Sequence, residues 1–315
     1  AQLSDQVSAI LEPLLVRLTA LEKHEEVIKM AQGPDLPPLP VLHANITELC
    51  SKELELAQQL TFIELEHLSY IGPEEFVQVF LKDNVQHTKD VKKTRNLESY
   101  ICWYDRLCAL VATEICKQSK KKNRVKVIEY WIEAARECVN IGNFNSLMAI
   151  MMGLNMDAVS RLKNTWSCID ISKLTILQLQ TDSASDFSSY RSTLKAALWR
   201  SSGTSDKTQR IVIPFFSLLL KDFFTMIEEC SITLPNGHIN FDKAWHLARQ
   251  VTEFIHWKQA DCPFDKSHKT KTYLQTSPIF SDRALEEASF SCEPPENQEE
   301  RERYNSMLKY EPIKA

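Results

Sequence analysis

Glycine is scarce in this sequence, with only six residues among 315. Glycine supplies the positive backbone angles of tight β-hairpins and the close backbone approach of phosphate-binding loops, so a protein built on either is not expected. Leu, Ala, Glu, Lys and Gln fill the long stretches instead, and these residues favour helices. The composition therefore predicts an all-α protein.

Long apolar runs and an excess of basic charge are also absent. No run approaches the roughly 18 apolar residues needed to cross a bilayer, and the first residues lack a signal-peptide pattern. The formal net charge of −5 and the pI near 6.0 give no basic surface for nucleic acid. With 43% hydrophobic residues, the chain can bury a large core. These features predict a soluble cytoplasmic protein that does not bind nucleic acid.

The cysteines show no sign of pairing. There are nine, an odd number, and no two of them form a CxxC motif. This spacing is typical of free thiols in a reducing compartment. Cys230 with His238 and Cys262 with His268 contain metal-ligating residue types, but neither has the second close pair that structural zinc sites use. No metal site is expected.

Motifs for bond-making chemistry are absent as well. The sequence has no GxxxxGK[S/T] or GxGxxG loop, no GxSxG and no HExxH. Glu228 and Glu229 are neighbours on a predicted helix, where adjacent side chains point in different directions, so they do not declare an acid–base pair. We expect neither covalent catalysis nor a bound cofactor.

The N-terminal residues differ from the rest of the chain. A helical apolar stripe covers residues 6–31, and a proline-rich stretch at 33–42 follows it as an extended linker. We therefore predict an N-terminal helix and linker over 1–43 and a main domain over 44–315.

Within the main domain, helical signals recur with clear punctuation. Residues 124–142 repeat apolar side chains every three or four positions, and Gly142 can supply a left-handed stop. Pro214 marks the start of one apolar helix and Asn240 can cap another, which predicts a helical hairpin. Residues 182–210 and 292–303 are polar and are predicted to be exposed loops.

A basic segment precedes the helix that ends at Gly142. A solvated loop and helix start is the preferred interpretation, and contact with acidic lipid headgroups or an acidic partner is the alternative. The segment contains Lys117, Lys120, Lys121, Lys122, Arg124 and Lys126.

Three segments, at 56–76, 140–166 and 213–229, resemble in order and spacing the signature blocks of the RasGEF catalytic domain. They read LAQQLTFIELEHLSYIGPEEF, NIGNFNSLMAIMMGLNMDAVSRLKNTW and IPFFSLLLKDFFTMIEE. Segments 96–115 and 236–259 match too, and the wording IGPEEF and LPNGHINF resembles the family-one subgroup. In that subgroup a helical exchanger motif precedes the catalytic domain, and the first helix here looks like the end of that motif.

The resemblance implies an all-α, orthogonal multi-helix domain with a protruding helical hairpin. Such domains are guanine-nucleotide exchange factors for Ras-subfamily GTPases of the Rap, Ras or Ral type, and lipidated GTPases bring them to membranes. The hairpin, here 214–258, displaces the switch I segment of the GTPase. By alignment, Phe224 falls where the family inserts a side chain toward the magnesium site, and Glu228 where a carboxylate engages the emptied phosphate loop.

Further residues are implied to support the hairpin or to contact the GTPase. They are Trp103, Asn143, Asn145, Asn155, Arg161, Leu162, Phe215, Lys221 and Asp222. Structural alternatives remain open: the aromatic residues can be core anchors, the asparagines caps or turn residues, and Glu228 a solvated acid at a helix end.

The sequence departs from the common family pattern at two places. Phe224 is bulkier than the usual aliphatic or small residue, and Lys221 replaces a common Thr, so substrate preference does not transfer directly. Some relatives retain the fold as a scaffold without exchange activity, and an inactive GTPase-binding module is therefore the alternative function.

Overall fold

The computed structural model describes residues 45–80, 94–229 and 233–309. Regular structure in these three ranges consists of fifteen helices, with two isolated β-bridges in place of strands. The all-α prediction is therefore confirmed. The N-terminal helix and linker predicted over 1–43 lie outside the described residues, so that boundary stays a prediction.

The helices are numbered in chain order. The first eight are α2 (Ile46–Leu49), α3 (Glu53–Tyr70), α4 (Pro73–Phe80), α5 (Arg95–Cys116), α6 (Lys121–Ile141), α7 (Phe144–Asn155), α8 (Asp157–Ser160) and α9 (Lys163–Trp166). The others are α10 (Ser172–Thr181), α11 (Ala184–Gly203), α12 (Phe216–Glu229), α13 (Phe241–Trp257), α14 (His268–Thr276), α15 (Asp282–Cys292) and α16 (Gln298–Lys309).

The core is built around α5 and α7, with α3 and α6 packed beside them. In the first part of α5 buried residues recur every three or four positions, at Leu97, Tyr100, Trp103 and Leu107, so one helix face enters the core. From residue 110 to residue 116 every position is buried, so the last part of α5 is surrounded by other elements. Gly153 lets α7 approach α5 closely, because a Cβ there would lie 2.6 Å from the Cys108 carbonyl oxygen. These four helices form the platform on which the other elements rest.

The turn between α6 and α7 is held against a distant segment of the chain. Gly142 ends α6 with φ of 96°, the left-handed stop predicted from the sequence. A Cβ at Gly142 would lie 2.4 Å from the Ile211 carbonyl oxygen, so only glycine fits. The next residue, Asn143, forms a β-bridge with Ile213. This bridge brings the segment that leads into α12 onto the platform.

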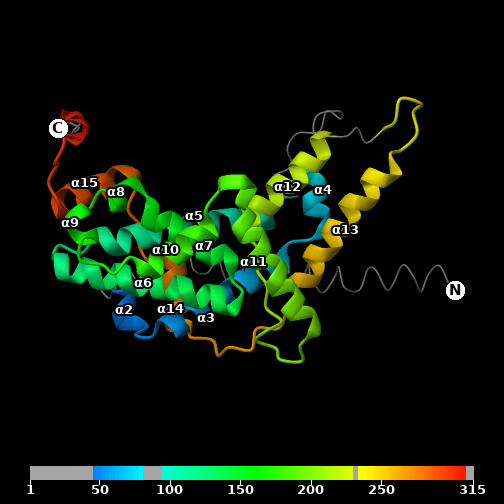
Figure 1. Ribbon diagram of the computed structural model, residues 1–315, viewed down its shortest axis with the longest axis horizontal. Coiled ribbons are helices and arrows are strands. Elements are labelled where there is room, and N and C mark those ends of the chain that lie inside the picture. Colours follow the sequence, from blue (N-terminus) through cyan, green and yellow to red (C-terminus); the bar gives the residue numbers. More distant parts are fainter. Residues whose placement is uncertain (1–44, 81–93, 230–232, 310–315) are drawn as a thin grey trace, which may run out of the picture. The chain divides into compact units, whose positions relative to one another are not determined.

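Helices α12 and α13 form the predicted hairpin. They pack against each other, and α13 also packs against α4. Figure 1 shows the loop before α13, residues 233–240, extending away from the other described helices. Asn240 caps α13 as predicted, since its side-chain oxygen accepts a hydrogen bond from the Lys243 N–H at 3.2 Å.

Two segments predicted as loops are helical instead. Residues 184–203 form α11, and residues 298–309 form α16. The many Ser and Thr residues of α11 make its sequence look like a loop. Tyr190 and Ala197, two turns apart on the helix, are nevertheless buried. Packing against the core overrides the weak local propensity in this segment.

None of the described helices combines the length and the apolar character that crossing a bilayer requires.

Candidate functional site

The base of the hairpin, residues 213–222, is fixed by side chains from other helices. The backbone N–H of Phe215 donates to the Tyr190 hydroxyl at 2.7 Å, and that of Phe216 donates to Asn145 Oδ1 at 3.1 Å. The first N–H groups of any helix lack intrahelical acceptors. Here α11 and α7 supply them, so the start of α12 is tied to the core.

The two asparagines of the NFN segment are both fully buried. Asn143 caps α7 by accepting from the Ser146 N–H at 3.0 Å, and its amide donates to Thr61 at 3.1 Å. Asn145 donates to Glu64 Oε2 at 3.0 Å while accepting from Phe216. Both side chains are occupied inside the domain, where Asn143 supports the turn and Asn145 supports α12.

Glu64 is a buried carboxylate that gathers donors from three directions. Trp103 Nε1 donates to it at 3.2 Å, the Ser146 hydroxyl at 2.7 Å and the Asn145 amide at 3.0 Å. Burial raises the pKa of the Glu64 carboxyl above its usual range, and the Tyr100 hydroxyl together with these three donors opposes the rise. Trp103 is thus a buried anchor whose ring also stacks on His67, with 5.9 Å between the ring centres.

Ion pairs on the outer side of the base join α12 to α11. Asp222 receives both Arg191 Nη atoms, at 2.7 and 2.8 Å, and Lys221 Nζ lies 3.0 Å from Asp186 Oδ1. The hydrogen bond from Lys221 and the charge of Arg191 hold the pKa of Asp186 below its usual value. Lys221 and Asp222 therefore act first as attachments of the hairpin.

Helix α12 has a buried face and an exposed face. Phe223 is fully buried, with its ring centre 5.2 Å from that of Phe76, whereas Phe224 is 37% exposed. Phe215 is half-buried between the rings of Tyr104 and Phe187. Thus Phe224 is the one of these three phenylalanines placed to meet another molecule.

Glu228 lies in the last turn of α12, and its side chain falls outside the described residues. Its predicted role at the phosphate loop is therefore untested and stays a prediction.

The tip of the hairpin, residues 233–245, carries apolar side chains in solvent. Ile239, Phe241 and Trp245 are 72%, 74% and 60% exposed. The rings of Phe241 and Trp245 stack, with 6.4 Å between their centres. Such a contiguous exposed apolar surface is typical of an interaction site.

The last three predicted residues lie around the end of α7. Asn155 is exposed, while Leu162 is fully buried and so has no side-chain surface for a partner in this conformation. Arg161 is engaged by the C-terminal helices: it pairs with Glu300 at 3.1 Å and stacks over the Phe290 ring at 4.2 Å. Leu162 and Arg161 thus have structural contacts here, and contact with a GTPase remains a prediction for Asn155 and Arg161.

Sequence reasoning missed Glu64, Tyr190 and Arg191. Glu64 had a usable signal, since it lies one helical turn from Leu60 and Leu68, both buried. An acid on an apolar helix face indicates a buried polar network. Tyr190 and Arg191 have no such signal, because the polar residues around them predict a loop.

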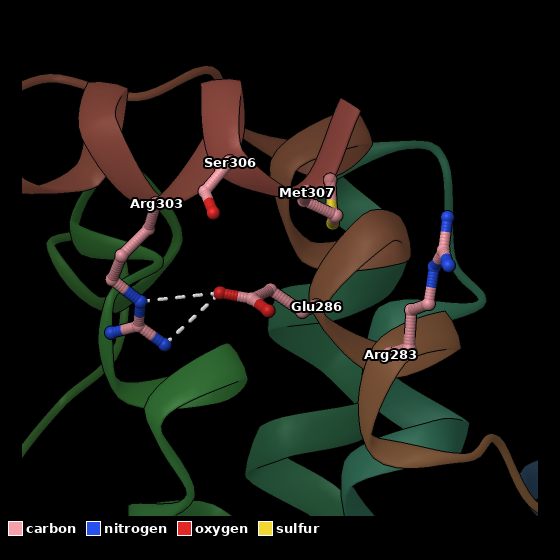
Figure 2. A pocket seen from close by; sticks show the side chains of 5 residues that line it. All are labelled: Arg283, Glu286, Arg303, Ser306 and Met307. Carbon is pink, nitrogen blue, oxygen red and sulfur yellow. Dashed lines mark hydrogen bonds and ion pairs between the residues drawn. The ribbon is translucent and has the colours of Figure 1, made fainter. Parts of the chain in front are cut away.

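A cavity of about 390 Å³ lies between α15 and α16, away from these residues. Figure 2 shows the ion pair of Arg303 with Glu286 in its wall, together with Arg283, Ser306 and Met307. None of its lining residues belongs to the hairpin or to the network beneath it.

Comparison with known families decides what kind of domain carries this hairpin. The RasGEF domain family matches residues 55–245, which is more than half of the chain. This chain belongs to the RasGEF-domain family. The match begins in α3, which carries Glu64, and ends in α13, so it contains both the base and the tip of the hairpin.

Curated relatives support the same assignment of this RasGEF domain. Ras-GEF domain-containing family member 1B of Homo sapiens is 49% identical over 313 residues, covering 96% of this chain and 66% of the relative. Member 1C of Homo sapiens is 49% identical over 305 residues, covering 95% and 65%. Member 1B-A of Danio rerio is 49% identical, covering 96% and 61%. The chain thus spans slightly less than two thirds of these relatives' length.

Proposed function

We propose that this RasGEF domain binds a Ras-subfamily small GTPase of the Rap, Ras or Ral type and accelerates its exchange of GDP for GTP. The observation that carries the proposal is the hairpin, which is tied to the core at its base and exposes Phe224 and the apolar tip. A rigid attachment and an apolar projecting surface are what a wedge requires. Exchange by this means makes and breaks no covalent bond.

The mechanism rests on competition for the nucleotide site. A GTPase holds its nucleotide through Mg²⁺, a phosphate-loop lysine and backbone N–H donors. In the proposed complex the hairpin lies beside switch I, with Phe224 near the Mg²⁺ position and the Glu228 carboxylate at the emptied phosphate loop. Each contact replaces one that the nucleotide needs, so nucleotide affinity falls.

Coupling between the two ligands is reciprocal. If the domain lowers nucleotide affinity, rebinding of nucleotide lowers the affinity of the domain by the same factor. The domain is therefore released and acts again. The domain favours neither nucleotide, so the excess of GTP in the cell sets the direction. A lipidated GTPase would bring the domain to its membrane.

The direct test is release of a fluorescent GDP analogue from Rap, Ras, Ral and Rho-type GTPases, with excess unlabelled nucleotide. We expect acceleration for one or more members of the Ras subfamily and none for the Rho type. Acceleration of none, with tight binding to a nucleotide-free GTPase, would instead indicate an inactive binding module. Absence of both would overturn the proposal.

Glu228→Ala supplies the site-specific arm of this test. Loss of a charge-assisted contact of about 1.5–3 kcal/mol predicts an exchange rate roughly ten to a hundred times lower. Glu229→Ala is the matched control, because neighbouring helix residues point about 100° apart. Equal rates for the two variants would remove Glu228 from the mechanism.

A further inference from the structure

The Glu64 carboxylate is costly where it lies. It is fully buried, and its donors Trp103, Asn145 and Ser146 are all neutral. Burying an ionised group is expensive even when it is hydrogen-bonded, and a well-packed apolar side chain of similar volume is often as stable or more stable. Stability alone therefore does not account for an acid at this position.

The chain of contacts leads from Glu64 to the start of the hairpin. A side-chain amide has a donor end and an acceptor end. Because Glu64 Oε2 accepts from Asn145 Nδ2 at 3.0 Å, Asn145 Oδ1 faces the opposite way and accepts from the Phe216 N–H at 3.1 Å. Phe216 is the first residue of α12, and its N–H has no acceptor within the helix.

We propose that Glu64 is a positioning residue for nucleotide exchange, which fixes the Asn145 amide and through it the point at which α12 begins. The inference rests on the function proposed above, since the hairpin must be the exchanging element. Glu64 does not touch the GTPase. It sets the orientation of the helix that carries Phe224, and a wedge that is poorly oriented binds without displacing the nucleotide efficiently.

The arrangement of hydrogen-bond donors and acceptors around Asn145 can be tested with a set of matched variants. Glu64→Gln keeps the shape but replaces one acceptor by an NH₂ group. If the new NH₂ group faces Asn145, it meets the Asn145 NH₂ group, and neither can accept a hydrogen bond. If the Asn145 amide turns over to avoid this, its NH₂ group faces the Phe216 N–H instead. If the new amide turns instead, its NH₂ faces Trp103 and Ser146. Every arrangement leaves an unmatched donor.

A second variant restores the pattern. Asn145→Asp alone keeps an acceptor for Phe216 but places its other oxygen against the Glu64 carboxylate, which is repulsive. Combined with Glu64→Gln, the new amide NH₂ donates to the new carboxylate, whose second oxygen accepts from Phe216. The double variant thus exchanges donor and acceptor between positions 64 and 145, and it keeps the acceptor at position 145 for the Phe216 N–H.

Glu114→Gln is the matched control. Glu114 is also buried, and it accepts from the Ile46 N–H at 3.1 Å and from the Tyr273 hydroxyl. It also forms an ion pair with Lys117, and none of these partners belongs to α12. The control therefore measures what the loss of a buried carboxylate, with its ion pair, does at a place remote in sequence from α12.

Two readouts are needed: the maximal exchange rate at saturating domain and the hydrogen–deuterium exchange of the Phe216 amide. Each single variant is expected to lower the maximal rate about fivefold to tenfold. Asn145→Asp is expected to lose protection at Phe216, because repulsion from Glu64 displaces the new carboxylate from the Phe216 N–H. Glu64→Gln is expected to lose protection in proportion to the population in which the Asn145 amide has turned over. The double variant recovers both, and Glu114→Gln changes neither.

The outcomes separate this inference from the function on which it rests. If the wild-type domain accelerates no GTPase, the proposed function fails, and amide exchange at Phe216 still decides whether the relay exists. If the wild-type domain is active and the single variants keep its maximal rate and its amide protection, the positioning role is overturned. Loss in the singles without recovery in the double variant overturns it as well.

Discussion

The base and the tip of the hairpin are built on opposite principles. At the base, buried or partly buried side chains from α7 and α11 hold residues 215–222 through Asn145, Tyr190 and Arg191. At the tip, Phe241 and Trp245 stack on each other in solvent. The base determines where the hairpin lies, and the tip is open to a partner. Substitutions at the base should therefore alter stability, and substitutions at the tip should alter recognition.

The largest effect separates two adjacent residues of α12. Phe223→Ala removes a fully buried ring and should lower the free energy of unfolding by about 3–5 kcal/mol. Phe224→Ala removes a ring that is 37% exposed and should cost less than about 1 kcal/mol while reducing nucleotide exchange. Urea unfolding and GDP release measure the two effects. Equal losses of stability would contradict the two-faced description of α12.

Tyr190→Phe tests the tie between α11 and the base. The variant keeps the ring but removes the oxygen that accepts from the Phe215 N–H at 2.7 Å. Leaving that N–H without an acceptor should cost about 1–3 kcal/mol in urea unfolding. Tyr304→Phe is a suitable comparison, because that residue is half-buried on α16, far along the chain from the hairpin. A cost no larger than that of Tyr304→Phe would show that the tie contributes little.

Asp222→Asn tests the outer ion pairs of the base, and a smaller effect is expected. Asp222 and Arg191 are each about one third exposed, so solvent screens their charges. The variant should lower the free energy of unfolding by at most about 1 kcal/mol. The loss should be smaller in 1 M salt, where the Debye length falls to about 3 Å and the charges are screened from each other. A loss that does not change with salt would indicate a role other than charge pairing.

The smallest effect on stability is expected at the tip. Trp245→Ser and Trp199→Ser each remove an indole that is mostly in solvent, so each should change stability by no more than about 0.5 kcal/mol. Only the first lies on the hairpin, and we expect it alone to weaken binding to a nucleotide-free GTPase. Binding measured by biolayer interferometry decides this, and equal binding by both variants would limit the contact surface to α12.

The sequence predicted two helix ends correctly. The stop at Gly142 and the cap at Asn240 depend on residues within a few positions of each other, so a local pattern is sufficient to find them. Residues 184–203 failed the same reasoning because their serines and threonines signal turns, while the buried Tyr190 that holds the helix is recognised only through packing with α7 and α12.

The site was only partly accessible from the sequence. Resemblance named Asn145 and Trp103, but it did not show that both donate to Glu64, which is 81 and 39 residues away along the chain. Pairings at such separations are set by the fold, and no periodicity encodes them. The predicted roles of Phe224 and Glu228 depend on a partner molecule, so they remain predictions that exchange measurements test.

The contacts of Arg161 bear on where a cooperative unit of this protein ends. Its guanidinium reaches Ser289, Glu293, Pro294 and Glu300, and Tyr273, Leu274 and Leu285 belong to the same buried core. The family match stops at residue 245, inside α13. A polypeptide that ended there would lack α15, so the face of α5 against which α15 packs would be exposed. Arg161 would also lose its hydrogen-bond acceptors. The length by which this family is recognised is therefore shorter than the length that must fold together.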